Sequence, residues 1–101
     1  MVRSLRAILI IGFLFSISAY SADLERGEKL FATCIQCHGE KGLGISEQKA
    51  PKIAGQHAWY IETQLKAFKS KKRKNPEMYP FIKNLSDKDY KDLAAFVAQL
   101  R

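Results

Sequence analysis

The sequence predicts a small all-α domain of about three to four helices, and three features of the chain lead to this prediction. The length of 101 residues suits a single domain. Apolar residues recur three and four positions apart in three separate stretches, which is the spacing of one helix face. No alternating run of β-branched residues precedes the two cysteines. The hydrophobic fraction of 47 % and the charged fraction of 27 % are typical of globular proteins rather than disordered ones.

The first predicted helix covers residues 23–33, and acidic side chains near its start complement the helix dipole. Gly27, Leu30 and Phe31 lie on one face of this helix. A glycine inside a helix costs about 1 kcal/mol relative to alanine. We therefore expect Gly27 to mark the close approach of another helix.

A second helix is predicted over residues 57–71, where Ile61, Leu65 and Phe68 form an apolar stripe. The last helix opens at Ser86, which is a good N-cap. Asp89 stands three residues later, as in a capping box with Asp in place of Glu. The apolar side of this last helix contains Tyr90, Leu93, Ala94, Phe96, Val97 and Leu100. We expect this side to pack on the Gly27 face of the first helix.

The most informative stretch is Cys34-Ile35-Gln36-Cys37-His38. Two cysteines three residues apart on a helical turn place both thiols on one side of the chain. The histidine that follows directs its imidazole to the same space. This spacing is typical of covalent c-type haem attachment through two thioethers. It makes Cys34 and Cys37 the attachment residues and His38 an axial ligand of the iron.

Three other uses of the cysteines fit the sequence less well. A thioredoxin-like redox pair requires a preceding strand within a βαβ unit. A structural zinc site requires four ligands, which the chain supplies only with the distant His57. A disulfide across so short a loop is the ordinary expectation for an exported chain, but it leaves His38 without a role.

Met78 is the expected second ligand of the iron. It lies in the segment 75–80, where Pro76 and Pro80 exclude a regular helix or a central strand. A thioether is a soft ligand suited to haem iron, and Met/His ligation raises the reduction potential. Ligation by His57, or an iron position left open, are the alternatives. Near His57, Trp59 and Tyr60 are expected to pack in the core, with contact to a haem edge or propionate as the alternative.

The N-terminal residues 1–21 have the composition of a signal peptide. Arg3 and Arg6 form a basic region, residues 7–17 form an apolar region, and small residues follow at 19 and 21. The apolar run is shorter than the roughly 20 residues that span a bilayer. An uncleaved membrane anchor is the alternative.

Cleavage is expected after Ser21, or after Ala22, which leaves a domain of residues 22–101. The full chain has a net charge of +7, and loss of the two N-terminal arginines reduces it to +5. Much of this charge lies in Lys69–Lys74, which either caps a solvated helix end or steers an acidic partner. Nucleic acid is a poor partner for an exported chain.

These residues, in this order, resemble the small soluble class I c-type cytochromes over residues 22–101. The resemblance is closest to the bacterial group whose modules occur singly or as tandem dihaem proteins. Gly27 and Phe31 match the contact positions of the family's first helix, and Leu93 and Phe96 match their counterparts on the last. The resemblance implies a class I cytochrome c fold, in which the N- and C-terminal helices cross and the chain wraps around one covalent haem c.

The same resemblance assigns further residues. The segment that begins at Pro51 resembles the family's Pro-x-Leu-x-Gly pattern, with Ile53 in place of leucine. It implies that the Pro51 carbonyl accepts a hydrogen bond from His38 and that Ile53 packs on the haem. Met78, followed by the helix start at Ser86, matches the family's ligand loop.

The resulting hypothesis is a monomeric, periplasmic one-electron carrier that is not an enzyme. If His38 and Met78 fill both axial positions of the iron, none remains for a substrate. Redox partner proteins would dock through small, short-lived contacts, with Lys69–Lys74 as the candidate surface. No stable membrane insertion is expected after cleavage. The alternatives are a haem protein with an open or labile sixth position, or a membrane-tethered subunit of a larger oxidoreductase.

Overall fold

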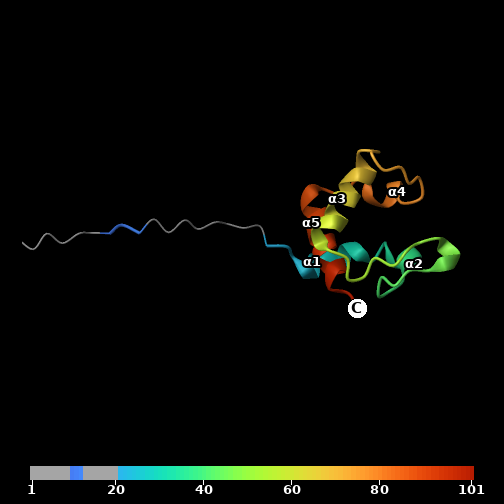
Figure 1. The fold of residues 1–101 in the computed structure, drawn as a ribbon, viewed down its shortest axis with the longest axis horizontal. Helices are drawn as coiled ribbons and strands as arrows, with labels where there is room; N and C mark the ends of the chain where they lie inside the picture. The colour runs from blue at the N-terminus through green and yellow to red at the C-terminus, as the bar shows by residue number, and fades with distance from the viewer. Residues whose placement is uncertain (1–9, 13–20) are drawn as a thin grey trace, which may run out of the picture.

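The computed structural model describes residues 10–12 and 21–101, and Figure 1 shows how their helices are arranged. Within these residues there is no β-strand, only an isolated bridge between Ile45 and Ala50. The elements are α1 (Leu24–Phe31), α2 (Ile35–His38), the 3-10 turn η1 (Ser46–Gln48), α3 (Ala58–Lys69), α4 (Tyr79–Ile82) and α5 (Asp87–Gln99). The predicted all-α class is therefore confirmed.

The three predicted helices are the three longest helices of the described chain, and α2 and α4 are single turns in addition to them. The segment 75–80 is less irregular than predicted, because α4 begins at Tyr79 and contains Pro80. Proline is tolerated in the first turn of a helix, where its missing N–H has no partner to lose. Most of the predicted signal peptide lies outside the described residues, and no described helix is long and apolar enough to cross a membrane.

Helices α1 and α5 cross in close contact, as the glycine on α1 predicted (Figure 1). A Cβ atom on Gly27 would overlap the carbonyl oxygen of Asp92 and lie 2.8 Å from the Cβ of Phe96. One turn further along, the rings of Phe31 and Phe96 pack with their centroids 5.4 Å apart. Any side chain larger than hydrogen at position 27 would therefore force the two helices apart.

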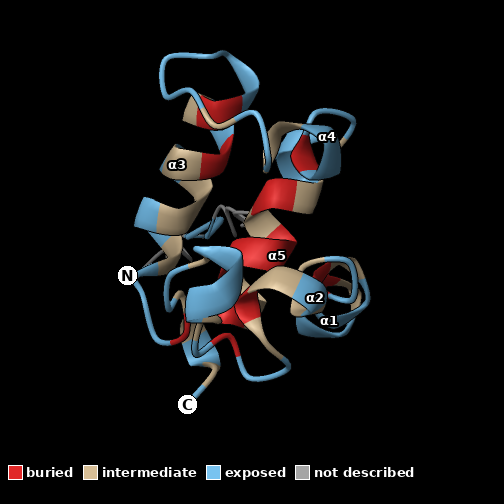
Figure 2. Cartoon of the chain, turned by 90° about the vertical axis from the view of Figure 1, so that its right-hand side faces the viewer, coloured by how far each residue is buried: buried red, intermediate tan, exposed pale blue. Residues whose placement is uncertain are grey.

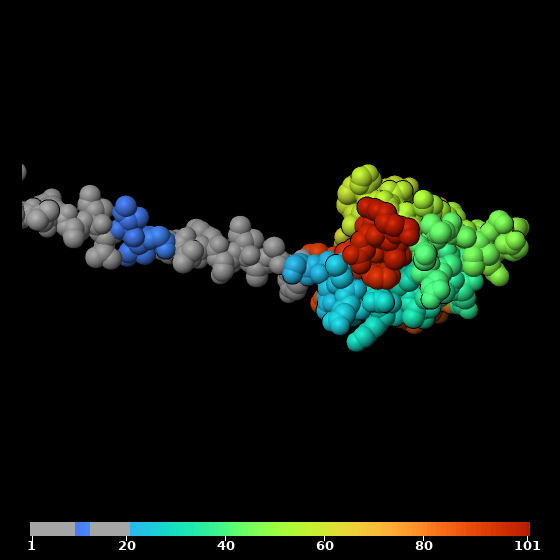
Figure 3. Space-filling view, turned by 90° about the horizontal axis from the view of Figure 1, so that it is seen from below, coloured from blue at the N-terminus to red at the C-terminus, as the bar shows by residue number. Residues whose placement is uncertain are grey.

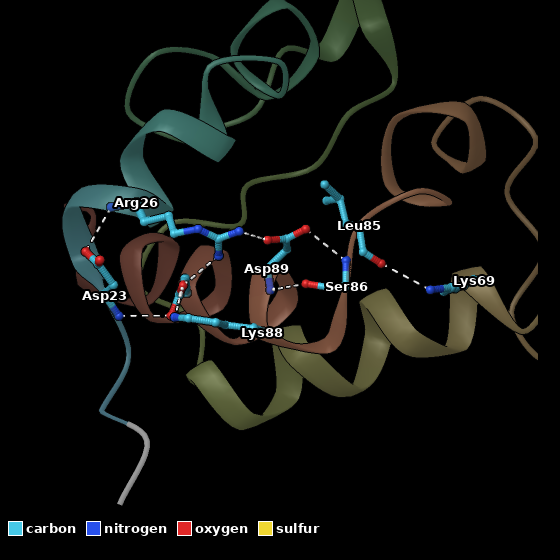
Figure 4. A network of polar contacts seen from close by, with 8 residues as sticks. Asp23, Arg26, Lys69, Leu85, Ser86, Lys88 and Asp89 are labelled. Carbon is cyan, nitrogen blue, oxygen red and sulfur yellow. Dashed lines mark hydrogen bonds and ion pairs between the residues drawn. The ribbon is translucent and has the colours of Figure 1, made fainter.

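A buried carboxylate reinforces this crossing (Figure 4). Asp92 is fully buried and accepts hydrogen bonds from Asp23 N (2.9 Å), Arg26 Nη1 (2.8 Å) and Lys88 Nζ (2.8 Å). Arg26 also pairs with Asp89, so its guanidinium joins α1 to two positions on α5. Burial alone would raise the pKa of Asp92, but the hydrogen bonds outweigh burial and lower this pKa to about 2.

The start of α5 is fixed by the predicted capping box. Ser86 Oγ accepts from Asp89 N at 3.1 Å, and the Asp89 carboxylate accepts from Ser86 N at 2.8 Å. The buried Tyr90 hydroxyl donates to the carbonyl oxygen of Ile82 at 2.5 Å. This bond ties α4 to α5 and holds the end of the loop that contains Met78.

Helix α5 forms the centre of the domain, and Figure 2 shows buried residues along its length. Helix α3 packs on α5 through Leu65 and Phe68, which are both buried. The expected core position of Trp59 is wrong, because its side chain is 67 % exposed. At 100° per residue, position 59 lies on the opposite side of α3 from the stripe that includes Leu65.

The loop between α2 and α3 packs against the C-terminal residues, and Figure 3 shows these segments side by side. Gly55 N donates to Val97 O at 3.2 Å. Gly44 has φ of +90°, and a Cβ there would lie 2.7 Å from Lys52 N, so only glycine fits without strain. These contacts hold Pro51, which directly precedes Lys52, in a fixed place beside α2.

We predict that Asp92→Asn lowers the free energy of unfolding at pH 7 by about 1–3 kcal/mol, because the cations around it lose their buried partner. Since the folded-state pKa is below the usual 3.8, Asp92 contributes stability above about pH 4, and this contribution is lost as the pH falls toward 2. Denaturant unfolding of the haem-loaded protein from pH 2 to pH 7 measures both effects.

The variant should therefore show a weaker loss of stability than the parent protein between pH 4 and pH 2. Glu40→Gln removes an exposed carboxylate and is the matched control, with an expected change below about 0.5 kcal/mol. A pH profile identical in parent and Asp92→Asn protein would contradict the assigned role of the buried carboxylate.

Candidate functional site

The residues of the Cys-x-x-Cys-His motif and Met78 line one region of the interior. A cavity of about 270 Å³ has Cys34, His38 and Met78 in its wall. A second hollow of about 80 Å³ shares these three residues and adds Cys37. The fold thus brings together all four predicted haem-binding side chains, which are separated by up to 44 positions in the sequence.

His38 is oriented by a backbone carbonyl, as the family resemblance implied. The side chain is buried, and its Nδ1 lies 2.9 Å from the oxygen of Pro51. A carbonyl oxygen can only accept, so Nδ1 carries the proton and donates it. The Nε2 atom is then left with a free lone pair, which is the form of histidine that binds a metal ion.

Met78 is positioned by a residue that the sequence analysis did not single out. The side-chain oxygen of Asn75 accepts from the backbone N of Met78 (3.2 Å) and of Glu77 (3.1 Å). The Asn75 carbonyl also accepts from Tyr79 N at 3.0 Å, at the start of α4. Asparagine before proline is a common turn former, and this signal was available in the sequence.

The two cysteines are half-buried and are not joined by a disulfide. Cys34 directly precedes α2, and burial raises the pKa of its thiol despite a hydrogen bond with Thr33. A thioredoxin-like pair instead has a lowered thiol pKa. Within the described residues, no three His, Cys, Asp or Glu side chains are grouped to hold a metal ion.

His57, the alternative ligand, lies apart from the motif. It is exposed and stacks on Trp59, with ring centroids 6.0 Å apart, and among the described residues it belongs to neither cavity wall. Tyr60 lines the larger cavity but is 39 % exposed, so the expected core position of this residue is also wrong.

The wall of the larger cavity is mainly apolar, with polar residues at its edge. Ile53 is part of this wall, as the family resemblance implied. Lys52 and Arg73 also line it, and none of its described residues carries a carboxylate. The apolar wall residues are Phe31, Pro51, Ile53, Ile61, Leu65, Phe68, Ile82, Leu93 and Val97. Such a wall suits a large apolar ring that bears negatively charged groups on its rim.

A family model described as cytochrome c matches residues 24–101. The chain belongs to the cytochrome c family. This cytochrome is a haem-based electron carrier, and its cofactor is covalently bound haem c with iron.

Known proteins similar to this cytochrome include single-module and longer ones. It is 37 % identical over 79 residues to cytochrome c-554(548) of Halomonas halodenitrificans, covering 75 % of this chain and 94 % of the relative. It is 33 % identical over 95 residues to a thiosulfate dehydrogenase electron acceptor of Stutzerimonas stutzeri, covering 85 % of this chain and 43 % of that protein. The crystal structure of cytochrome c4 from Pseudomonas stutzeri superimposes with a TM-score of 0.72 at 31 % identity, over 79 % of this chain and 50 % of the other.

The residues present fit haem c. The two hollows together offer an imidazole nitrogen, a thioether sulfur and two thiols around one apolar space. The imidazole has its second nitrogen already occupied by the Pro51 carbonyl, as in the outer-shell arrangement that orients metal-binding histidines. Both nitrogen and sulfur donors are suited to haem iron.

We predict that the Cys34→Ala/Cys37→Ala chain, which cannot retain a covalent haem, is largely unfolded. At about 24 cal/mol per Å³ of empty cavity, a space of about 270 Å³ corresponds to up to about 6 kcal/mol. This is comparable with the whole stability of a small domain. Far-ultraviolet circular dichroism and thermal melting test the prediction, with the haem-loaded parent protein as the control. A cooperative, native-like melt of the variant without haem would contradict it.

Proposed function

We propose that this cytochrome is a periplasmic one-electron carrier with haem attached to Cys34 and Cys37 and with iron ligated by His38 and Met78. The observation that carries the proposal is the convergence of these four side chains on two hollows that share part of their walls. Bound haem iron supplies one-electron chemistry by changing between its ferric and ferrous states.

The contribution of the protein is to hold and tune the site. The Pro51 carbonyl keeps the proton of His38 on Nδ1, which leaves Nε2 for the iron. Asn75 fixes the backbone on both sides of Met78, so the thioether needs little ordering when it binds. The apolar wall excludes water and raises the reduction potential together with the methionine ligand.

The proposal also explains why we do not assign an enzymatic activity. With His38 and Met78 both assigned to the iron, no iron position would remain for a substrate. The residues of the site are therefore assigned to holding the haem, and turnover is left to the redox partners.

The predicted signal peptide is the basis for the periplasmic location. The family match begins at residue 24 and α1 begins at Leu24, which agrees with a domain of residues 22–101. The basic and apolar composition of residues 1–21 supports export, and covalent attachment of haem c takes place after export.

Partner proteins are proposed to be acidic redox proteins that approach the basic cluster Lys69–Lys74. All six residues of this cluster are exposed. Opposite charge accelerates encounter without requiring a large interface, which suits a carrier that must dissociate quickly. A relative named as an electron acceptor of thiosulfate dehydrogenase makes a sulfur-oxidising enzyme one candidate donor.

We predict that Met78→Leu removes the far-red absorption band that methionine ligation gives the oxidised protein. Leucine retains the volume and apolar character of the side chain but offers no sulfur. The reduced variant should bind carbon monoxide rapidly, and its reduction potential should fall by on the order of 0.1 V, within the range of ~0.8 V that axial ligands control. Visible spectra and redox titration provide the measurements.

Glu77→Gln is the matched control, because it changes the neighbouring exposed side chain and leaves both proposed ligands in place. This control should retain the far-red band, and its reduced form should not bind carbon monoxide rapidly. Rapid carbon monoxide binding by the unmodified protein would instead support an open or labile sixth position and reject the proposed ligand.

We predict that N-terminal sequencing of the exported protein finds Ala22 or Asp23 as its first residue. The protein should then be recovered in the periplasmic extract rather than with the membranes. Replacement of Ala19 by a bulky residue should block processing and retain the protein on the membrane. An unprocessed N-terminus in the parent protein would favour the membrane-tethered alternative.

A further inference from the structure

A separate basic hollow lies beside the haem cavity, between the end of α3 and the start of α4. Its volume is about 400 Å³, and its cations are Lys71, Arg73 and Lys74, all of them exposed. The rest of the wall consists of Phe68, Asn75, Pro76 and Tyr79. None of the described wall residues carries a carboxylate, so the three positive charges are not neutralised within the hollow.

The hollow divides the basic cluster Lys69–Lys74 into two groups. Lys69 is not part of its wall, and its Nζ donates to Leu85 O at 3.1 Å (Figure 4). The same Nζ lies 5.7 Å from the centre of the Tyr90 ring. Lys72 is exposed but is not part of the wall. Lys69 and Lys72 therefore carry the same positive charge as the three wall residues and lie on the same segment, but they do not line the hollow.

Two of the three cations in the hollow are held by aromatic rings. Lys71 Nζ lies 5.1 Å from the centre of the Tyr79 ring, and the Arg73 guanidinium lies 4.6 Å from that of Phe68. Arg73 also donates to the side-chain oxygen of Gln64 at 2.9 Å. Because Lys71 and Arg73 already have these contacts, binding of a partner would cost less side-chain entropy here than at lysines without such contacts.

The hollow shares part of its wall with the haem cavity of about 270 Å³. Phe68, Arg73 and Asn75 line both spaces. A partner seated in the hollow is therefore separated from the cavity by a single layer of side chains. Asn75 also holds the backbone of Met78, so this layer continues to the proposed ligand.

We propose that Lys71, Arg73 and Lys74 form the docking site for an acidic redox protein, whose carboxylates enter this hollow. Lys69 and Lys72 contribute only to the overall charge. The inference rests on the proposed electron-carrier function and narrows its basic cluster to the three residues that line the basic hollow. Complementary charge sets the encounter rate, and a patch of this size suits a short-lived redox complex.

The test uses the haem-loaded protein and two double variants of equal net charge. Lys71→Gln/Lys74→Gln removes two charges from the hollow, and Lys69→Gln/Lys72→Gln removes two charges outside it. Arg73 is left unchanged because it also lines the haem cavity. The probe is the anionic oxidant hexacyanoferrate(III), whose reduction by each ferrous protein is followed by stopped-flow absorbance. A hexaglutamate peptide serves as a competitor that imitates an acidic protein segment.

At low ionic strength the hollow variant should react about tenfold more slowly, and the control variant less than twofold more slowly. The difference should disappear near 1 M salt, where the Debye length is about 3 Å. Hexaglutamate should slow the parent and the control variant but not the hollow variant. The cationic oxidant tris(phenanthroline)cobalt(III) should show no slowing in either variant.

Equal slowing of the two variants would overturn the inference, because the net charge of the cluster would then explain the rate. No slowing in either variant would also reject docking at the whole cluster Lys69–Lys74. Both outcomes leave the electron-carrier function standing if the absorption spectra and reduction potentials match the parent protein. Loss of the haem spectrum in the parent would instead reject the proposed function itself.

Discussion

The crossing of α1 over α5 is the contact on which the rest of the structure depends. It is possible only because Gly27 lets the two backbones touch, with the Asp92 carbonyl where a Cβ atom would otherwise stand. The same residue, Asp92, then uses its buried carboxylate to hold the N-terminal end of α1 through Asp23 and Arg26. Close packing and a charged hydrogen-bond network thus act at one point and fix the first and last helices together.

The remaining helices surround a space rather than fill it. Helix α3 packs on α5 from another side, and the loop that contains Pro51 is held in place by its contacts with the C-terminal residues. This arrangement leaves an apolar cavity whose wall includes His38 and Met78. A domain of this size buries only a thin apolar core of its own, which is the physical reason for a large covalently held cofactor in this cavity.

Some cations of the protein form intramolecular contacts that stabilise the fold, whereas others are exposed to solvent. Arg26 and Lys88 pair with the buried carboxylate of Asp92, and Lys69 donates to the carbonyl oxygen of Leu85, just before α5. The cations of the basic hollow remain directed to solvent beside the haem cavity. An electron carrier benefits from this division, because fixed charges stabilise the fold and the exposed ones act on partners.

The sequence by itself determined the helices, the haem attachment motif and the identity of the proposed ligands. Periodicity predicted α1, α3 and α5 to within a few residues, and the glycine on α1 predicted a close crossing, because these signals are local. The helical turn at the cysteine motif was predicted and is α2, whereas the position of Trp59 outside the core and the single turn α4 were not predicted. A single helical turn is too short to show a periodic apolar pattern, so whether it forms depends on the residues packed around it.

Only the tertiary structure decided which residues support the site. Asn75 precedes a proline, which is a local turn signal, but the sequence does not show that this turn fixes the backbone of a residue in the cavity wall. The division of the basic cluster depends on the contact of Lys69 with Leu85, which is 16 residues away and has no signal in residue spacing. Chemistry that lies within five consecutive residues can be recognised from sequence, whereas contacts between distant segments exist only once the helices have packed.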